Sequence, residues 1–303
     1  MMRSAATALL AALAAAFAAG APDLAIERGG AWHVWWRSDS APAAWPAELP
    51  AVTSALSWRT AGPGLEWGEL RLSGSGEAWR IRVVVVRLDP GQHTLQLETP
   101  PPRKGPPNRW TVDHAPAEAA LALNAGQFGS DGAWGWVVRD GIEQQAPGSG
   151  PLAPAIVIDR DGTFRIVPAD SISDVRASGR VAQAFQSYPA LLDGNGAVPR
   201  PIRAEGSGVD LDHRDARLAI GELRDGRMLI ALTRFEGFGG VLDNLPFGLT
   251  TPEMAAVMGA LGARRAVLLD GGISSQLLLR TATGTHAWRG MRYVPLGLSA
   301  KAR

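Results

Sequence analysis

The pattern best suited to chemistry is an aspartate followed by two glycines. Asp270 ends an apolar run, and Gly271 and Gly272 follow it directly. Paired glycines let the backbone turn sharply and come close to a ligand. Ser274 and Ser275 add hydroxyl groups and backbone amides, which suit an anion. We therefore expect a carboxylate at the end of a buried strand, beside a turn that can bind an anion.

A second polar turn follows another apolar run. Asn124 comes directly after a strand-length stretch of alanine and leucine, and Gly126 and Gln127 follow it. An amide side chain both donates and accepts hydrogen bonds, so it can orient a polar substrate. From the residues alone, this turn and the one at Asp270 are also compatible with ordinary connections between a strand and a loop.

Composition limits the chemistry that these residues can do. The chain has 303 residues, 46% of them apolar and 19% charged, with a net charge of +1 and no cysteine. Such a chain can bury a sizeable core and is not disordered, and its charge gives no basis for non-specific nucleic-acid binding. The lack of cysteine excludes disulfides, thiolate nucleophiles and cysteine-ligated metals. Catalysis must therefore use oxygen and nitrogen groups.

Common catalytic motifs are absent from the sequence. It contains no phosphate-binding GxxxxGK[ST] loop, no GxGxxG turn, no GxSxG elbow and no HExxH metal helix. The cluster of Asp210, Asp212, His213 and Asp215 has alternating carboxylates but lacks the spacing of an EF-hand. We expect a solvated loop there, and neither a metal nor another cofactor.

The N-terminus is typical of an exported protein. Arg3 precedes an alanine- and leucine-rich run at 5–17, and small residues follow at 19–21. We interpret residues 1–21 as a secretory signal peptide. A membrane anchor is the alternative, but the run is only weakly hydrophobic. No later segment is apolar enough to span a membrane, so we expect a periplasmic or secreted mature protein.

The rest of the chain predicts two regions. Residues 22–55 are rich in alanine, proline and tryptophan without helical periodicity, so we expect a mostly irregular N-terminal segment with no more than one short strand. Residues 56–303 are expected to form the main domain.

Apolar runs separated by Gly, Pro and Asp turns predict many strands in the main domain. The expected strands lie at 65–72, 79–88, 94–98, 119–123, 135–139, 155–158, 163–167, 181–185, 217–221, 228–233 and 265–270. A proline-rich loop is expected at 100–107 and a helix at 251–261, with Pro252 and Glu253 in its first turn and Gly262 after its end. These elements predict an α+β fold, with a mixed, largely antiparallel sheet and flanking helices in a single main domain.

Four short motifs occur along the chain in a characteristic order. They are Asn124–Phe128, Gln186–Leu192, Arg217–Gly221 and Leu269–Ser275, the last preceded by the expected helix and strand. In this order they resemble the phosphodiester glycosidase domain family, with a match from about Leu56 to Leu298.

The resemblance implies an activity. It implies hydrolysis of a sugar-1-phosphodiester at the anomeric carbon, which releases a sugar and a phosphomonoester. A phosphomonoester is a good leaving group, so the site mainly needs anion stabilisation and a carboxylate near an oxocarbenium-like centre. The substrate would be a glycan or sugar phosphodiester of the envelope or extracellular space.

The resemblance also implies roles for particular residues. Asp270 would be the catalytic carboxylate, Arg217 would grip phosphate oxygens, and Asn124 would orient the substrate. The implied substrate-binding residues are Gly126, Gln127, Gln186, Ser187, Gly271, Gly272, Ser274 and Ser275. A glycosidase usually needs a second carboxylate. The candidates, which the sequence does not rank, are Asp193, Asp215 and Glu236.

Two other functions remain open at this point. A catalytically silent protein that binds glycan or peptidoglycan is favoured by departures from the family pattern at Gln127, Leu218 and Ile273. A metal-dependent phosphodiesterase would require Asp210, Asp212, His213 or Asp270 to converge on a cation. A purely structural ion pair between Arg217 and Asp270 is the alternative to a catalytic role for these two residues.

Overall fold

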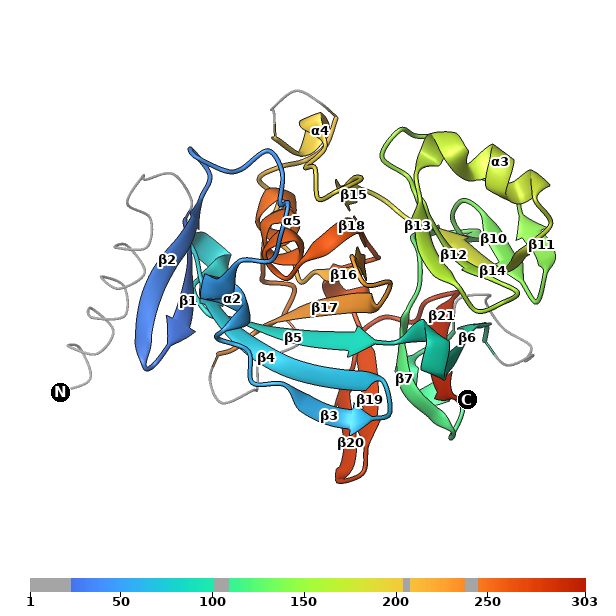
Figure 1. Cartoon of the computed structure of the whole chain (residues 1–303), viewed down its shortest axis with the longest axis horizontal. Helices are drawn as coiled ribbons and strands as arrows, with labels where there is room; N and C mark the ends of the chain where they lie inside the picture. The colour runs from blue at the N-terminus through green and yellow to red at the C-terminus, as the bar shows by residue number, and fades with distance from the viewer. Residues whose placement is uncertain (1–22, 101–108, 204–207, 238–244) are drawn as a thin grey trace.

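The computed structural model describes residues 23–100, 109–203, 208–237 and 245–303, which form several antiparallel sheets with few helices (Figure 1). The expected signal peptide at 1–21 and residues 101–108 of the expected proline-rich loop lie outside the described residues. Every strand pair in the described ranges is antiparallel. The α+β expectation of one main domain is confirmed, although the strands divide among several sheets.

The largest sheet forms the centre of the molecule. In spatial order its strands are β15 (Ala190–Leu192), β18 (Ala263–Leu268), β16 (Leu218–Leu223), β17 (Met228–Phe235), β5 (Ile81–Leu88), β4 (Leu65–Ser73), β1 (Asp23–Arg28) and β2 (Ala31–Arg37), with β3 (Arg59–Gly62) paired to β4. The helices are α2 (Pro50–Thr53), α3 (Ile172–Ala177), α4 (Arg200–Arg203) and α5 (Thr251–Ala260).

Two five-stranded sheets and a short hairpin complete the fold. The second sheet has the order β20 (Gly284–Trp288), β19 (Leu277–Thr281), β7 (Ala119–Asn124), β21 (Gly297–Ala302) and β6 (His93–Glu98). The third has the order β11 (Ile142–Gln145), β10 (Val137–Arg139), β14 (Val181–Gln186), β12 (Ala155–Asp159) and β13 (Phe164–Val167), and α3 lies beside it (Figure 1). The hairpin joins β8 (Phe128–Gly129) to β9 (Gly132–Ala133).

The large sheet is buried on both faces, which explains its long apolar strands. On β5, Val83 and Val85 join the cluster that contains α5, whereas Val84 and Val86 join the cluster formed with the second and third sheets. Successive side chains of a strand point to opposite faces, so a strand covered on both sides needs an unbroken apolar run. The sequence signal of β5 thus reflects its central place.

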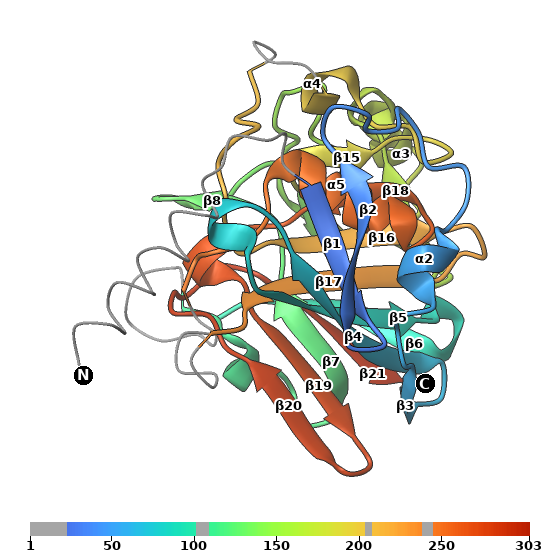
Figure 2. The ribbon, with the colours of Figure 1, turned by 90° about the vertical axis from the view of Figure 1, so that its left-hand side faces the viewer.

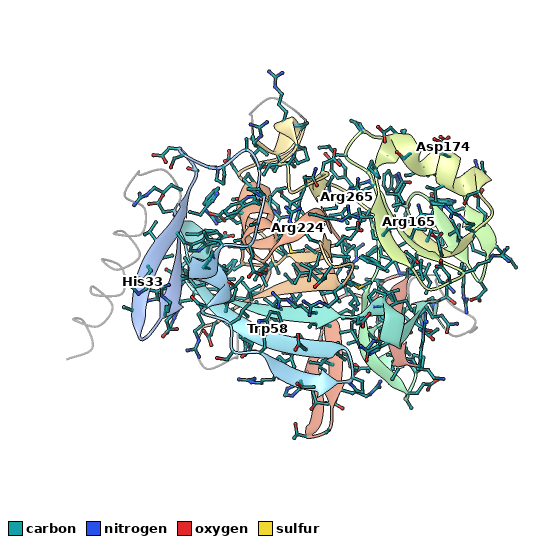
Figure 3. The ribbon with its side chains drawn as sticks, viewed as in Figure 1. His33, Trp58, Arg165, Asp174, Arg224 and Arg265 are labelled. Atoms are coloured by element: carbon teal, nitrogen blue, oxygen red, sulfur yellow. The ribbon has the colours of Figure 1, made fainter. Side chains whose placement is uncertain are left out.

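The N-terminal segment differs from its expectation. Residues 23–37 form two strands, and β1 pairs with β4 through Ala25 and Ile26. Leu24, Ile26 and Trp36 are buried in the core beside α5. The segment is therefore part of the central sheet, and its edge strand β2 carries His33 at the outer side of the molecule (Figure 3).

Helix α5 confirms the expected helix to within one residue at its end. The Thr250 side chain accepts a hydrogen bond from the Glu253 amide, and the Glu253 carboxylate accepts one from the Thr250 amide. This reciprocal capping satisfies two amides that otherwise lack partners at a helix start. The helix is buried along nearly all its length and lies over β15 and β18, as the turned view also shows (Figure 2).

The strand before Asp270 ends earlier than the sequence suggests. β18 stops at Leu268: the Leu269 amide still donates to Leu218 of β16, but the Asp270 amide donates to Gly126 at 3.2 Å, outside this sheet. The chain leaves the sheet to meet another turn.

No helix among the described residues is long and apolar enough to cross a membrane.

Candidate active site

Antiparallel pairing brings the two principal motifs together. Ala219 of β16 pairs with Leu268 of β18, so the end of β18 lies beside the start of β16. Asp270, just after β18, therefore faces the segment that holds Asp215 and Arg217, just before β16. Residues about fifty positions apart in sequence become neighbours through this one register.

The Asn124 amide holds the Asp270 turn from the side of β7. Its Nδ2 donates to the Asp270 carbonyl at 2.9 Å, and its Oδ1 accepts from the Gln276 amide at 2.9 Å. The side chain is buried and does not line the pocket described below. Both functions of the amide group are used on backbone, so Asn124 fixes the position of the turn that carries Asp270.

Close packing explains the two glycines. The Gly272 amide donates to the Ala216 carbonyl at 2.7 Å, and Gly272 has a φ of +57°. A Cβ on Gly272 would lie 2.8 Å from Oδ2 of Asp215, and one on Gly271 would lie 2.7 Å from the Ala216 oxygen. Only glycine fits where a carboxylate touches the backbone this closely. The pair thus lets the Asp270 turn pack against the Asp215 segment.

These turns line a pocket of about 590 Å³, a size suited to a small ligand. Its wall contains three carboxylates, Arg217 and two aromatic side chains. The lining residues are Gln127, Trp134, Ser149, Gly150, Tyr188, Pro189, Gly208, Val209, Asp210, His213, Asp215, Arg217, Thr251, Leu268, Leu269, Asp270 and Gly271.

Burial perturbs the carboxyl groups of Asp270 and Asp215. It raises the pKa of Asp270, and the negative charge of Asp215 raises this pKa further, whereas a hydrogen bond from Ser274 and the charge of Arg292 oppose the rise. Burial likewise raises the pKa of Asp215, against the charge of Arg217 and a hydrogen bond from the Ala216 amide. A carboxyl whose pKa is raised keeps its proton to a higher pH, which suits general acid–base chemistry.

Arg217 supplies a cation at the same wall. Its Nε donates to the Leu249 carbonyl at 2.8 Å, and its Nη2 donates to the His213 carbonyl at 2.6 Å. A guanidinium has five N–H groups, so these two bonds fix its plane and leave donors for a ligand. Burial lowers the pKa of Arg217 and the charge of Asp215 raises it, but an arginine remains protonated in proteins.

A buried ion pair anchors the segment that precedes Arg217. Arg214 makes two hydrogen bonds to the Glu253 carboxylate of α5, at 2.6 and 2.9 Å, and one to the Ser75 hydroxyl at 3.1 Å. Asp215 follows directly and exchanges backbone hydrogen bonds with Leu249. The start of α5 thereby sets the position of the second carboxylate.

Comparison with protein-family models decides the family. The phosphodiester glycosidase model matches residues 117–299, which is more than half of the chain and includes both sides of the pocket. The chain belongs to the phosphodiester glycosidase family.

Solved structures share the fold of this family member. The catalytic domain of zebrafish N-acetylglucosamine-1-phosphodiester alpha-N-acetylglucosaminidase, auto-inhibited by its pro-peptide, is 18% identical over 82% of this chain and 87% of that chain, with a TM-score of 0.62. A hypothetical protein from Synechocystis is 15% identical over 94% of this chain and 69% of that chain, with a TM-score of 0.53. Comparison with curated protein sequences gives no match.

Within the family motifs, Gln127 and Gly126 lie at the pocket or beside it. Gln127 lines the pocket, and its Nε2 donates to the Tyr188 carbonyl at 3.0 Å. Gly126 has a φ of +69°, and its carbonyl accepts the Asp270 amide. Gly126 therefore acts on the site through the position of Asp270.

Gln186 and Ser187 are buried in the framework instead of the pocket wall. The Gln186 side chain bonds to the backbone of Trp136, Gly148 and Ala153, and the Ser187 hydroxyl donates to Leu268 at 2.5 Å. Neither side chain lines the pocket. Their hydrogen bonds join the third sheet to the end of β18 and so support the site from behind.

Ser274 and Ser275 also lie behind the lining residues. Both are buried, and their amides, with that of Gly272, donate to carbonyls of the turn or of Ala216. Ser274 is the hydroxyl that bonds to Asp270. The amides of these three residues are therefore used in holding the turn.

The structure ranks the three candidates for a second carboxylate. Asp215 lines the pocket with Asp270. Glu236 pairs with Arg71 at 3.1 Å, and Asp193 is exposed beyond β15; neither lines the pocket. No ion pair joins Arg217 to Asp270, although both residues are fully described.

Sequence reasoning named Asp215 only as one of three unranked candidates and left the two aromatic pocket residues, Trp134 and Tyr188, without a role. Asp215 stands two positions before Arg217, a spacing that places both side chains on one side of an extended segment, and this signal was available. Tyr188 lies within the second motif, Gln186–Leu192, but was given no part in binding. Trp134 belongs to none of the four motifs. Among the described residues no group of three or more Asp, Glu, His or Cys side chains is placed to hold a metal ion.

Proposed function

We propose that the protein is an exported hydrolase that cleaves the bond between the anomeric carbon of a sugar and the oxygen of a phosphodiester. One observation carries the proposal: Asp270 and Asp215, two half-buried carboxyls whose pKa values burial raises, line one pocket with Arg217. Export is proposed from the signal-peptide pattern of residues 1–21. Family membership supports the reaction class.

In the proposed reaction, water attacks the anomeric carbon as its bond to the phosphate oxygen breaks. The bonding electron pair leaves with the phosphate, and the proton of the attacking water passes to a carboxylate, for which we propose Asp270. Asp215, in its protonated form, donates to the departing phosphate. The remaining N–H groups of Arg217 bind phosphate oxygens and offset the charge that develops on them.

The aromatic residues suit the sugar. Trp134 and Tyr188 are half-buried side chains that line the same pocket as the two carboxyls. Aromatic faces pack well against the C–H surface of a ring while leaving its hydroxyl groups free to hydrogen-bond. We therefore place the sugar ring between these walls and the carboxyl pair, with Gln127 available to its hydroxyls.

The test is hydrolysis of a panel of sugar-1-phosphodiesters by the wild type and by Asp270→Asn, Asp215→Asn and Asp193→Asn, with and without chelator. We expect free sugar and a phosphomonoester as products, with losses of about 10²- to 10⁴-fold in the first two variants. Asp193→Asn is the matched control because its carboxylate is exposed outside the pocket.

Other outcomes separate the alternatives. Activity that disappears in chelator, with cleavage of the P–O bond, would support a metal-dependent phosphodiesterase. Absence of turnover on a broad panel, together with glycan binding that survives Asp270→Asn, would support a silent binding protein.

A further inference from the structure

An apolar surface adjoins the Asp270 turn. Ile273, Met291 and Tyr293 have exposed fractions of 41%, 66% and 56% and are three of the seven large apolar side chains that the described residues expose. The Ile273 carbonyl accepts hydrogen bonds from the amides of Met291 and Arg292, at 2.7 and 3.1 Å. The two segments are thus joined by backbone, and we call their three apolar side chains the apolar rim.

A cation, Arg292, lies between Met291 and Tyr293 in the chain. The Arg292 guanidinium stacks 4.8 Å from the centre of the Phe128 ring, which limits the directions that its N–H groups can take. Its charge also acts on the Asp270 carboxyl, where it lowers the pKa against the effect of burial. A guanidinium beside apolar side chains suits a ligand with a phosphate at one end and an apolar chain at the other.

We propose that the apolar rim binds the alcohol part of the phosphodiester while Arg292 binds its phosphate, and that this alcohol carries a long alkyl chain. The inference rests on the proposed function, because the sugar in the pocket leaves the second substituent of the phosphate to extend past Asp270 and Gly271. That path leads to Ile273, two residues beyond the pocket wall. A sugar alcohol would need several hydrogen-bonding partners, and of the three rim side chains only Tyr293 offers one.

The geometry also accounts for the exposure of the rim. Exposed apolar side chains that gather beside a polar pocket commonly mark a binding surface. Covering them with an alkyl chain removes apolar area from water on both partners. The predicted substrate is therefore an amphiphile, with its phosphate held between Arg217 and Arg292.

The experiment compares sugar-1-phosphate diesters that share one sugar and carry either a methyl or an octyl alcohol, below the micelle concentration. We expect kcat/KM to favour the octyl diester by about tenfold or more in the wild type. Met291→Ser and Tyr293→Ser should each lower the octyl-to-methyl ratio about fivefold. Ile142→Ser is the matched control, because Ile142 is 63% exposed on β11 and lies outside the pocket lining.

A binding measurement separates failure of this inference from failure of the proposed function. Octyl phosphate and methyl phosphate imitate the phosphomonoester product, and the octyl compound should bind at least tenfold more tightly, with Met291→Ser removing most of the difference. If no diester is hydrolysed, the proposed function fails and this binding comparison decides the subsite. An octyl-to-methyl ratio near one in both assays would overturn the inference. The inference would also be overturned if Ile142→Ser reduced the octyl preference as much as Met291→Ser does. Binding to vesicles without any preference for the octyl compound would overturn it as well.

Discussion

At the scale of single residues, the environment of two carboxyls matters more than their identity. Asp270 and Asp215 are both half-buried, and this burial is the main reason that the pKa of each is raised. The charge of Asp215 adds to the rise at Asp270. Asp161, by contrast, accepts a hydrogen bond from the Thr163 amide in an exposed turn, which lowers its pKa. The same side chain thus holds its proton more tightly in the pocket and loses it more readily in the exposed turn.

The raised pKa values predict a pH dependence of the activity. Asp215 must keep its proton to protonate the departing phosphate, so kcat/KM should fall as the pH rises through the raised pKa of Asp215. On this limb the rate should drop about tenfold per pH unit. The profile should be measured on a sugar-1-phosphodiester from pH 4 to 9. In Asp215→Asn the residual rate should lose this limb, and a limb that persists there would assign the proton to another group.

The same shifts predict a stability effect with a definite sign. A carboxyl with a raised pKa in the folded state costs no stability below its unfolded pKa, and costs most above its folded pKa. Asp270→Asn should therefore raise the free energy of unfolding by about 1 kcal/mol at pH 8 and leave it unchanged near pH 3. Urea unfolding at both pH values measures this. Asp161→Asn, whose carboxyl has a lowered pKa, should give no gain at pH 8, and an equal gain for Asp270→Asn at both pH values would contradict the argument.

At the scale of elements, two turns must pack without side chains between them. We predict that Gly272→Ala lowers kcat about 100-fold, because a Cβ would push the Asp215 carboxylate away from its position. Gly29→Ala is a matched control: Gly29 has a similar φ of +60°, and nothing lies within 4 Å of its added Cβ. Both variants should lose about 1 kcal/mol of stability from backbone strain, but only Gly272→Ala should lose activity. If Gly29→Ala lowered kcat as much as Gly272→Ala does, backbone strain and not the close approach to Asp215 would explain the loss of activity.

Helix α5 and the segment before β16 depend on each other through a buried ion pair. Glu253→Gln should lower the free energy of unfolding by about 3 kcal/mol, because it leaves the Arg214 charge without its partner and weakens the cap of α5. Thermal and urea unfolding measure this loss. Asp225→Asn, which breaks an exposed pair with Arg227, should change stability by less than about 0.5 kcal/mol. A small effect for Glu253→Gln would mean that water replaces the ion pair.

At the scale of the whole molecule, the central sheet includes the N-terminal strands. A chain that starts at Asp39 lacks β1 and β2 and uncovers the core around α5, whereas a chain that starts at Asp23 retains both strands. Loss of Leu24, Ile26 and Trp36 should remove roughly 5 kcal/mol, a large share of a typical total stability. We expect the chain from Asp39 to be largely unfolded by circular dichroism at 37 °C. A cooperative unfolding transition like that of the chain from Asp23 would show that the strands are an appendage.

The sequence by itself determined the elements whose apolar pattern is strong. The expected strands at 65–72 and 228–233 and the expected helix at 251–261 correspond to β4, β17 and α5, because burial on one or both faces fixes which positions must be apolar. The sequence analysis allowed no more than one short strand in this segment, whereas 23–37 form two paired strands. Much of β2 is exposed at the sheet edge, so its positions do not alternate between apolar and polar.

Only the tertiary structure decided how the pocket is assembled. Asp270 and Arg217 stood out from their motifs, but the pairing of β16 with β18 makes Asp215 the partner carboxyl, and the same packing places Asn124, Gln186 and Ser187 behind the wall. Strand register and turn contacts depend on residues far apart in the chain, and local sequence carries no record of them. The sequence thus indicated that a carboxylate and an arginine would form the site. The antiparallel register determined which of the candidate residues lie together.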